Sequence, residues 1–542
     1  MRIIFFIIFL ASFSIHAQEE AWFYFRAQDT TFTPSFEKKG EFLHYTGDDD
    51  RLKAALQNYK IKTFKKTYRK AKKQNLKRTF FVIANNKAIM IDLLQNTSHI
   101  FESGEVIATD EKKIFEPNDY GLTSTITDNE GFEANLDYLD FLGLPEAWYY
   151  TTGDRKTIVG ISDGAIDTTN VEFKNKIKVF HKTQDINGHG TSVASIAAGQ
   201  GDNGYGIPGV CYDCSIYSTF YGRFRTFDYM QELSKAGARV INCSWAGRSK
   251  YENVQQEINE MFARGTIVVA SAGNNGWDKN TGKLSYNPAS YENVISVSSV
   301  NYKYETINEN IEQTESGLNY INNIRGYVGR TGGFKNNDIS SGIIHTYPIS
   351  VTTLNKDVDI LAPSTGVLSF ANSIKKGKPY YITIEATSPA APLVSGTIGL
   401  LFSLYPCLPT NEVESILKMT ATNIDTIEAN KPYTGMYGAG MLNTGRAVKM
   451  VFDMYAEKES VTIQNQRFSR WDFKLTSISD VLMQNQEFTE NATLNLISKK
   501  RITISKNTVL KPNANGKIHL KINPSLKKDC ELQLRDPSIL ND

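Results

Sequence analysis

Four polar residues stand at the ends of apolar segments, and together they could perform nucleophilic catalysis. Asp163 ends the run "TIVGISD", His189 lies in "NGHGTSVASIAAG", Asn274 closes "GTIVVASAGN", and Ser388 lies in "ATSPAAPLVSG". A serine hydroxyl attacks a carbonyl well only when a base takes its proton, and an amide can donate to the oxyanion that then forms. Each residue alone has a simpler interpretation, as a turn former, a helix cap or a core side chain.

The segment that follows Ser388 indicates how this serine would be held. The run "PAAPLVSGTIGLLFSLYP" is apolar all round, which predicts a helix buried in the centre of a domain. A helix start points its backbone N–H groups and the positive end of its dipole at whatever the serine attacks. The glycines on both sides of His189 would let the backbone turn sharply and let other segments come close to the imidazole.

The elements between residues 113 and 450 predict an α/β fold. Apolar runs such as "TIVGISD", "ARVINCSWAG" and "GTIVVASAGN" alternate with amphipathic segments such as "ENVQQEINEMFARG". Strands that are apolar on both faces belong to a parallel sheet that helices cover on both sides. Function in such folds gathers at the carboxyl ends of the strands, where Asp163 and Asn274 stand.

These segments, taken together, resemble those of the subtilisin-like serine proteases, the subtilases. The family's aspartate, histidine, oxyanion asparagine and serine segments are matched in order by "VGISDGAID", "NGHGTSVAS", "SAGNNG" and "ATSPAAPLVSG". The entry into the catalytic domain resembles "NLDYLDFLGLPEAWYYTTG", and its closing segment resembles "YGAGMLNTGRAV". The resemblance covers about residues 115 to 450, and the order Asp, His, Ser is the subtilisin order.

The resemblance implies a serine endopeptidase that hydrolyses peptide bonds through an acyl-enzyme. Ser388 would attack the scissile carbonyl and His189 would accept its proton. Asp163 would orient and stabilise the imidazole, and Asn274 would bind the oxyanion together with the N–H of Ser388. The pocket walls would include Ser244, Trp245, Ala246, Gly247, Ala272 and Gly273. A floor of small residues favours a large substrate side chain.

Several residues depart from the family pattern. They are Ala386 for a glycine, Pro389 directly after the serine, Gly164 and Ala165 for a hydroxyl-bearing residue and a glycine beside the aspartate, and Ser192 for a histidine. Proline disfavours the helical conformation in the residue before it, although it suits the first position of a helix. The departures at Gly164, Ala165 and Ser192 are expected to leave the triad whole. Ala386 and Pro389 leave a second interpretation open, a catalytically impaired subtilase-fold protein that acts as a peptide-binding or adhesive module.

Composition and pattern divide the 542 residues into four parts. Residues 1–17 have the pattern of a signal peptide, which predicts a secreted, cell-surface or periplasmic protein. Residues 18–112 resemble an α+β prodomain that assists folding and acts as a transient inhibitor until it is cut away near "GEVIATDEKK". Their basic stretch is interpreted as a solvated face or as a charged helix. Residues 113–450 form the catalytic domain, with a surface insertion at 301–356. Short strand-like runs in 451–542 predict a small C-terminal β domain.

Charge and cysteines narrow the choice of partners and cofactors. The net charge of +2 gives no support for nucleic acid or a membrane surface as a partner, and no later run is apolar enough to span a bilayer. Cys211 and Cys214 form a single C-x-x-C without a second pair for zinc, which favours a local disulfide in an oxidising compartment. Cys243 is predicted to be buried, and Cys407 and Cys530 have no evident partner. No cofactor is required; calcium is frequent in the family, but no ligand cluster can be assigned.

Overall fold

The computed structural model divides the chain into two compact units, Met1–Lys113 and Ile114–Asp542. The second unit contains both the expected catalytic domain and the expected C-terminal β region. The predicted signal peptide and the centre of the predicted processing region, residues 108–112, lie outside the described residues. The structure describes residues 21–40, 42–66, 77–107, 113–117, 119–120, 136–183, 188–274, 285–302, 311–315, 317–320, 325–328, 330–341, 343–346, 353–371, 380–383, 386–457 and 459–541.

The first unit is built on a six-stranded antiparallel sheet with the strand order β2-β3-β4-β5-β1-β6. Alternate residues of β1 are buried, so Phe23 and Phe25 pack in one core with Leu52 of α1 and Leu93 of α3. The elements are β1 (Ala21–Ala27), β2 (Phe36–Lys39), β3 (Phe42–Tyr45), α1 (Asp50–Leu56), β4 (Ile61–Lys66), β5 (Thr79–Ala84), α3 (Ala88–Asn96) and β6 (Phe101–Val106).

Seven parallel strands form the central sheet of the second unit, in the order β17-β12-β11-β10-β7-β9-β8. Successive residues of one strand enter different cores: Val269 packs in the core that contains α9, and Val268 packs in the core that contains α7 and α8. This double burial confirms the predicted α/β fold with a covered parallel sheet. The strands are β7 (Ile158–Asp163), β8 (Ile177–His181), β9 (Ser215–Phe220), β10 (Ala238–Cys243), β11 (Ile267–Ser271), β12 (Val294–Val300) and β17 (Ile360–Pro363).

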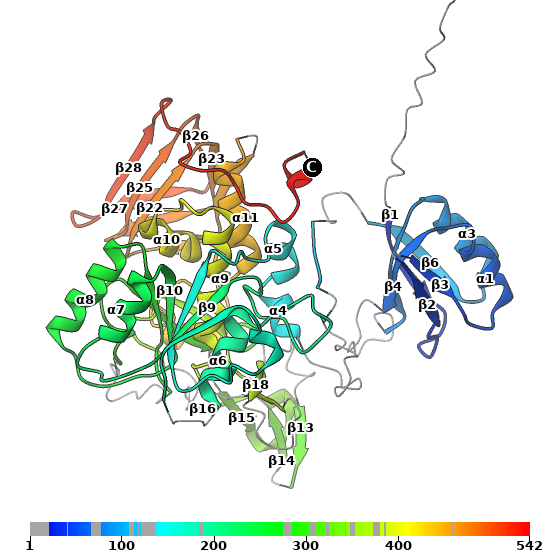
Figure 1. Ribbon diagram of the computed structural model, residues 1–542, viewed down its shortest axis with the longest axis horizontal. Coiled ribbons are helices and arrows are strands. Elements are labelled where there is room, and N and C mark those ends of the chain that lie inside the picture. Colours follow the sequence, from blue (N-terminus) through cyan, green and yellow to red (C-terminus); the bar gives the residue numbers. More distant parts are fainter. Residues whose placement is uncertain are drawn as a thin grey trace, which may run out of the picture. The chain divides into compact units, whose positions relative to one another are not determined.

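The helices of the second unit cover both faces of this sheet (Figure 1). Helix α9 lies against β7, β10, β11, β12 and β17, and all of its residues are buried, as its apolar sequence predicts. Helix α6 packs on α9, while α7 and α8 contact the opposite face. The helices are α4 (Asp137–Phe141), α5 (Leu144–Tyr150), α6 (His189–Ala198), α7 (Asp228–Lys235), α8 (Glu252–Ala263), α9 (Ala390–Leu404), α10 (Thr410–Thr420) and α11 (Thr444–Tyr455).

Three two-stranded antiparallel sheets lie outside the central sheet. Two of them fall within residues 301–356, the stretch expected to be an insertion, of which the structure describes only part. The third stands between β17 and α9. The pairs are β13 (Ile311–Thr314) with β14 (Gly317–Tyr320), β15 (Arg330–Phe334) with β16 (Ile343–Thr346), and β18 (Leu368–Ala371) with β19 (Tyr380–Thr383).

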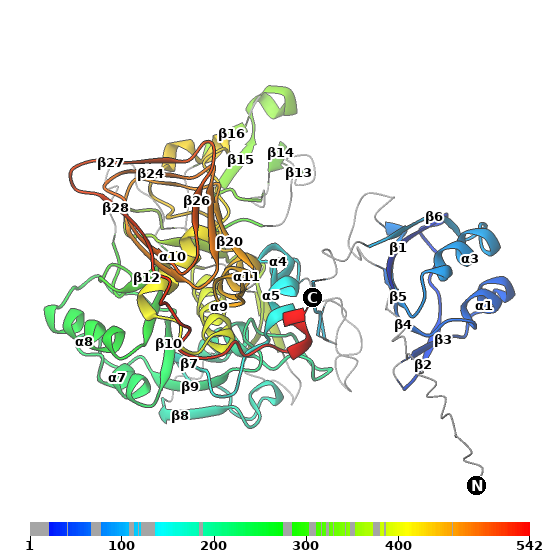
Figure 2. The same cartoon turned by 90° about the horizontal axis from the view of Figure 1, so that it is seen from above.

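The C-terminal β region is a parallel solenoid, a more specific architecture than the small β domain that the sequence predicts. Three successive coils stack so that strands about one coil apart pair in parallel, which gives the triplets β20-β23-β26, β21-β24-β27 and β22-β25-β28 (Figures 1 and 2). The strands are β20 (Ser460–Gln464), β21 (Arg467–Phe468), β22 (Asp472–Ser477), β23 (Asp480–Gln484), β24 (Glu487–Glu490), β25 (Thr493–Ser498), β26 (Ile502–Ile504), β27 (Val509–Pro512) and β28 (Lys517–Ile522).

The solenoid is attached to the catalytic part at both of its ends. Its first coil packs on α10 and α11. After the last coil the chain returns, where Cys530 forms a disulfide with Cys407, and the backbone N–H of Arg535 donates to the carbonyl oxygen of Tyr150, at 2.8 Å. The sequence offers no partner for Cys407 or Cys530 because 123 residues separate them. Among the described residues, no helix is both long and apolar enough to cross a membrane.

Candidate active site

Asp163 and His189 form a hydrogen-bonded pair at the carboxyl edge of the central sheet. Asp163 is the last residue of β7 and is only 3% exposed. Its Oδ1 accepts from the backbone N–H of Gly164, at 2.7 Å, and lies 2.7 Å from Nδ1 of His189. A buried carboxylate at Nδ1 holds the imidazole in one orientation and stabilises its protonated form.

Glycine is needed on both sides of His189 for reasons that the structure makes visible. Gly188 has a φ of 85°, a left-handed conformation that favours glycine and starts α6 abruptly. A Cβ on residue 190 would lie 2.4 Å from the carbonyl oxygen of Gly164, so only glycine allows α6 to approach the turn after β7. In the first turn of the helix, Thr191 Oγ1 accepts from the N–H of Asp167, at 2.8 Å. These contacts fix the histidine backbone relative to Asp163.

The second carboxylate oxygen of Asp163 has no hydrogen-bond donor. Oδ2 is buried and without a partner, and the residue next along the chain, Gly164, brings no side chain to it. A buried acceptor left without a donor costs about 1 to 3 kcal/mol. The departure at Gly164 therefore leaves the carboxylate less supported, while its bond to His189 is kept.

Ser388 lies in a tight turn that leads into α9, and it is 7% exposed. Two reciprocal bonds tie it to the end of β10: Ser244 Oγ donates to the carbonyl oxygen of Ser388, at 2.8 Å, and Ser388 Oγ donates to the carbonyl oxygen of Ser244, at 3.2 Å. Pro389 takes a helical conformation, with φ −73° and ψ −23°. Because the first N–H groups of a helix have no intrahelical partner, proline removes no helical hydrogen bond here.

Asn274 is anchored to the residue before the serine. Its Oδ1 accepts from both the backbone N–H and the hydroxyl of Thr387, each at 2.8 Å. These two donors identify the oxygen end of the amide and turn it towards Thr387. The nitrogen end is then the part of this side chain that can donate to a ligand, next to the turn that holds Ser388.

The substrate-pocket residues predicted from the sequence fall in two groups. Trp245 and Gly247 line a pocket of about 100 Å³, whereas Ser244, Ala246, Ala272 and Gly273 do not line it. Aromatic rings that the sequence analysis missed make up much of its wall, and Trp245 lies 5.0 Å from Phe224, centroid to centroid. A polar anchor fixes the indole, since Nε1 donates to the carbonyl oxygen of Ser162, at 2.9 Å. The other lining residues are Phe227, Arg248, Ser249, Tyr251, Asn287 and Tyr291.

The density of aromatic residues in "FYGRFRTFDY" was the available signal for this wall. Which of those rings would face the pocket depends on how the loop between β9 and α7 folds. Another family departure, Ser192, is fully buried in α6 and forms a hydrogen bond with the hydroxyl of Ser369 on β18. It therefore packs inside the protein, away from the pocket.

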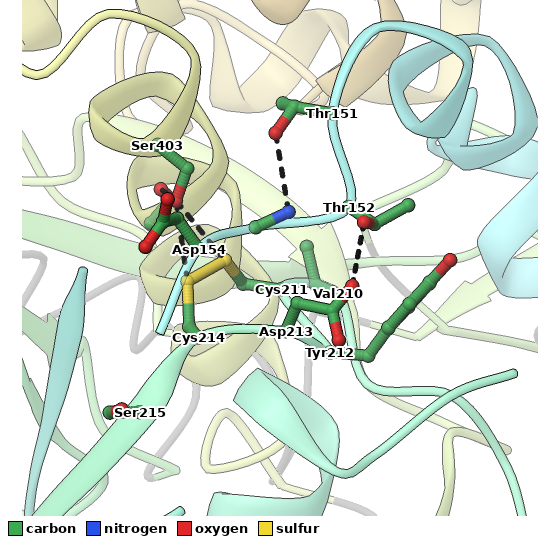
Figure 3. Close-up of a disulfide and its surroundings, with 12 residues drawn as sticks. Thr151, Thr152, Asp154, Val210, Cys211, Tyr212, Asp213, Cys214, Ser215 and Ser403 are labelled. Atoms are coloured by element: carbon green, nitrogen blue, oxygen red, sulfur yellow. Dashed lines mark hydrogen bonds between the residues drawn. A yellow bond between two sulfur atoms is a disulfide. The ribbon is translucent and has the colours of Figure 1, made fainter. Parts of the chain in front are cut away.

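The C-x-x-C pair lies in the core behind α9 (Figure 3). Cys211 and Cys214 form a disulfide, and both are fully buried. Ser403 of α9 lies beside it, with its Oγ 3.6 Å from Cys214 Sγ. Nearby, Thr152 Oγ1 donates to Asp213 Oδ2, at 2.7 Å, which fixes the loop. Burial of both sulfurs favours a structural role for this disulfide over redox exchange. Cys243 is a free, buried thiol.

Two buried carboxylates lie near the loop at residues 202–206. Glu172 is fully buried, and both of its carboxylate oxygens are without a hydrogen-bond partner. Burial, and then the neighbouring charge of Asp119, raises the pKa of Glu172 well above its usual value. Burial also raises the pKa of Asp119 to about 6, although the N–H groups of Asp202 and Asn203 donate to it. Among the described residues, no group of three or more His, Cys, Asp or Glu side chains could hold a metal ion.

The geometry and the sequence comparisons define the class of protein. The sequence profile of the subtilase family matches residues 154–440, more than half of the chain, so the protein belongs to this family of serine peptidases.

Individual relatives are distant. The chain is 26% identical to Subtilisin DY of Bacillus licheniformis over 303 residues, which covers 54% of this chain and 90% of that one. It is 28% identical to the major intracellular serine protease of Bacillus subtilis (strain 168) over 279 residues, covering 48% and 72%. Among solved structures, a protease from Pseudoalteromonas arctica aligns with a TM-score of 0.42 at 22% identity, covering 57% of this chain and 94% of that chain.

Proposed function

We propose that the protein is an exported serine endopeptidase in which Asp163, His189 and Ser388 form the catalytic triad. The observation that carries this proposal is the bond between the buried Asp163 and Nδ1 of His189 at the carboxyl edge of the sheet. In such a pair the other ring nitrogen, Nε2, acts as the base. Membership in the subtilase family supports the same reaction.

The proposed reaction proceeds in two acyl-transfer steps. Ser388 Oγ turns from the carbonyl oxygen of Ser244 and bonds to the scissile carbonyl carbon, while its proton moves to His189. The C–N bond breaks, the leaving amine takes the proton from His189, and an acyl-enzyme remains on Ser388. Water then gives a proton to His189 and attacks the carbonyl carbon of the ester. The C–O bond to Ser388 breaks, Ser388 Oγ takes the proton back from His189, and the carboxylic acid product leaves.

Asn274 is proposed to stabilise the oxyanion in both steps. The amide nitrogen of its side chain and the backbone N–H of Ser388 would donate to the negative oxygen. The bonds from Thr387 to Oδ1 support this assignment, because they orient the amide before substrate binds. A donor that is already oriented needs no reorganisation during the reaction.

The substrates are proposed to be polypeptides with a bulky apolar side chain near the cut bond. Ser244 forms a hydrogen bond with Ser388, and the next residue along the chain, Trp245, lines the aromatic pocket. Apolar side chains fill pockets lined by aromatic rings and exclude water from them.

Export, inhibition by the prodomain and calcium binding are further parts of the proposal. Residues 1–17 would direct export, and residues 18–112 would act as a transient inhibitor that is cut away. Calcium takes six to eight oxygen ligands, and among the described residues no cluster of three or more acidic side chains could hold it, so calcium binding is proposed from the family resemblance without assigned residues.

A catalytically impaired peptide-binding module is the second candidate. The unpartnered Oδ2 of Asp163 is the observation that favours it, because a poorly supported carboxylate orients the base less firmly.

A serine-directed fluorophosphonate probe separates the two candidates. Matured protein should be labelled, Ser388→Ala should lose the label, and Ser525→Ala, which changes an exposed serine outside the proposed active site, should keep it. Absence of label on folded, matured wild type would favour the binding module. N-terminal sequencing of the same preparation tests whether the signal peptide and prodomain are removed.

A further inference from the structure

The three coils of the C-terminal solenoid alternate in charge. Residues 460–479 carry three basic residues and one acidic residue, residues 480–498 carry three acidic residues and no basic one, and residues 499–528 carry nine basic residues and no acidic one. Ion pairs join neighbouring coils, since Arg467 lies 3.3 Å from Glu487 and Arg501 lies 2.8 Å from Asp480. The acidic middle coil is thus placed between two basic ones, and the outermost coil is basic.

The outermost coil is the only one of the three that lacks a covering layer among the described residues. Its strands β26, β27 and β28 each pair with one neighbouring strand, whereas β23, β24 and β25 each pair with two. Burial falls at this end of the stack: Ile463 and Met483 are 1% and 0% exposed, and the next residue in the same column, Ile504, is 50% exposed. Val509 and Ile522 are also exposed.

Strand β28 combines an open edge with a regular pattern. Its sequence "KIHLKI" alternates basic residues, which are exposed, with apolar ones. The apolar residues of β28 stack on residues that are fully buried in the inner coils. Ile518, for example, pairs with the buried Leu494, which pairs with the buried Phe473. A strand added beyond β28 would place its own apolar residues over Ile518 and Leu520, and its alternate residues beside Lys517, His519 and Lys521.

A second copy of the same edge fits this surface poorly. Lysines on an edge strand repel an identical edge, which is one way in which proteins prevent edge-to-edge association. The same lysines attract an acidic strand, because opposite charges directly across a strand pair stabilise it. The exposed backbone groups of the edge supply hydrogen bonds to any added strand.

From these observations we propose that the outer coil, residues 499–528, binds a polypeptide segment of alternating acidic and apolar residues as an added strand along β28. The partner is another protein that carries this pattern, and its bound strand extends the charge alternation of the solenoid by one acidic layer. The surface differs from the catalytic site, so the proposal does not depend on proteolytic activity.

Binding of a labelled peptide tests this proposal on the full-length chain. Ser388→Ala protein is titrated into a peptide with six alternating glutamates and valines, the length of β28, between Gly-Ser flanks, and mass spectrometry checks that the peptide stays intact. An isomer with its glutamates and valines in separate blocks, and a lysine–valine peptide, are the controls. We expect the alternating acidic peptide to bind at least about tenfold more tightly than either control.

Hydrogen exchange and charge reversal locate the bound strand. The acidic peptide should slow amide exchange within residues 517–522. The double variant Lys517→Glu, Lys521→Glu should weaken binding at least about tenfold. The double variant Lys174→Glu, Lys235→Glu makes the same charge change at two exposed lysines elsewhere in the chain and should not weaken binding. Equal binding of the block isomer or of an acidic polysaccharide, without protection of β28, would overturn the proposal in favour of a general polyanion surface. Absence of binding would also overturn the proposal, and the lysines would then serve only to prevent other strands from pairing with this edge.

Discussion

Two replacements of Asn274 separate the two tasks of this side chain. Its Oδ1 accepts two bonds from Thr387, and its amide nitrogen is proposed to donate to the oxyanion. Asn274→Ala removes both functions. Asn274→Asp keeps an acceptor for Thr387 but has no donor for the oxyanion, so the two variants should differ in stability and agree in their loss of catalysis.

The expected magnitudes follow from these contacts. Loss of a side-chain oxyanion donor raises the activation barrier by about 3 to 4 kcal/mol, so kcat should fall about 10²- to 10³-fold in both variants with little change in KM. Thr387 is fully buried, so in Asn274→Ala its N–H and hydroxyl lose their acceptor, which should lower the free energy of unfolding by about 1 to 3 kcal/mol. Asn274→Asp should lose much less stability.

Steady-state kinetics on a peptide substrate and urea unfolding of the same preparations measure both effects. The proposed oxyanion role is refuted if Asn274→Asp keeps kcat within about threefold of wild type. The anchoring role is refuted if Asn274→Ala is as stable as wild type.

Three further outcomes are expected. Glu412 is buried with Oε2 unpartnered, and burial raises its pKa from 4.5 to about 7. As the pH rises, the unfolded chain loses this proton at a lower pH than the folded chain, so the free energy of unfolding should fall by roughly 3 kcal/mol between pH 4.5 and 7. Glu412→Gln should flatten that part of a curve of Tm against pH. Cys407→Ser should lower the free energy of unfolding by about 2 to 5 kcal/mol in urea titrations, because Cys530 then no longer closes a long loop; an unchanged midpoint would contradict this. Removal of calcium by a chelator should lower the Tm of the wild-type protein, and a Tm that chelation leaves unchanged would argue against calcium binding.

The strand-end residues of the candidate site could be found from the sequence because parallel sheets impose a simple rule. Asp163 ends a strand that is apolar on both faces, and the carboxyl ends of such strands meet at one edge of the sheet. The role of the glycines around His189 could also be predicted, because a close approach of two backbone segments requires glycine. The bonds of Ser388 to Ser244 were not, because they depend on how the turn before α9 packs against the end of β10.

The solenoid was missed because its local pattern is ambiguous. Alternation of apolar and polar residues is the same in a sandwich strand and in a solenoid strand. The distinguishing signal was a repeat: "IQNQRF" at 463–468 recurs as "MQNQEF" at 483–488. Asn465 and Asn485 both have positive φ, and Asn485 Nδ2 donates to Asn465 Oδ1, at 2.7 Å, so equivalent corners stack on each other. A regular spacing of this kind indicates stacked repeats.

The disulfide between Cys407 and Cys530 affects what happens when a protease cuts the C-terminal region. A single backbone cut between residues 456 and 529 would leave the downstream piece covalently joined to the catalytic part through Cys530. The solenoid is therefore joined covalently to the catalytic part at both of its ends. A single cut by another protease would change the pattern of bands on a reducing gel without releasing the solenoid, and release would need a second cut or reduction of the disulfide.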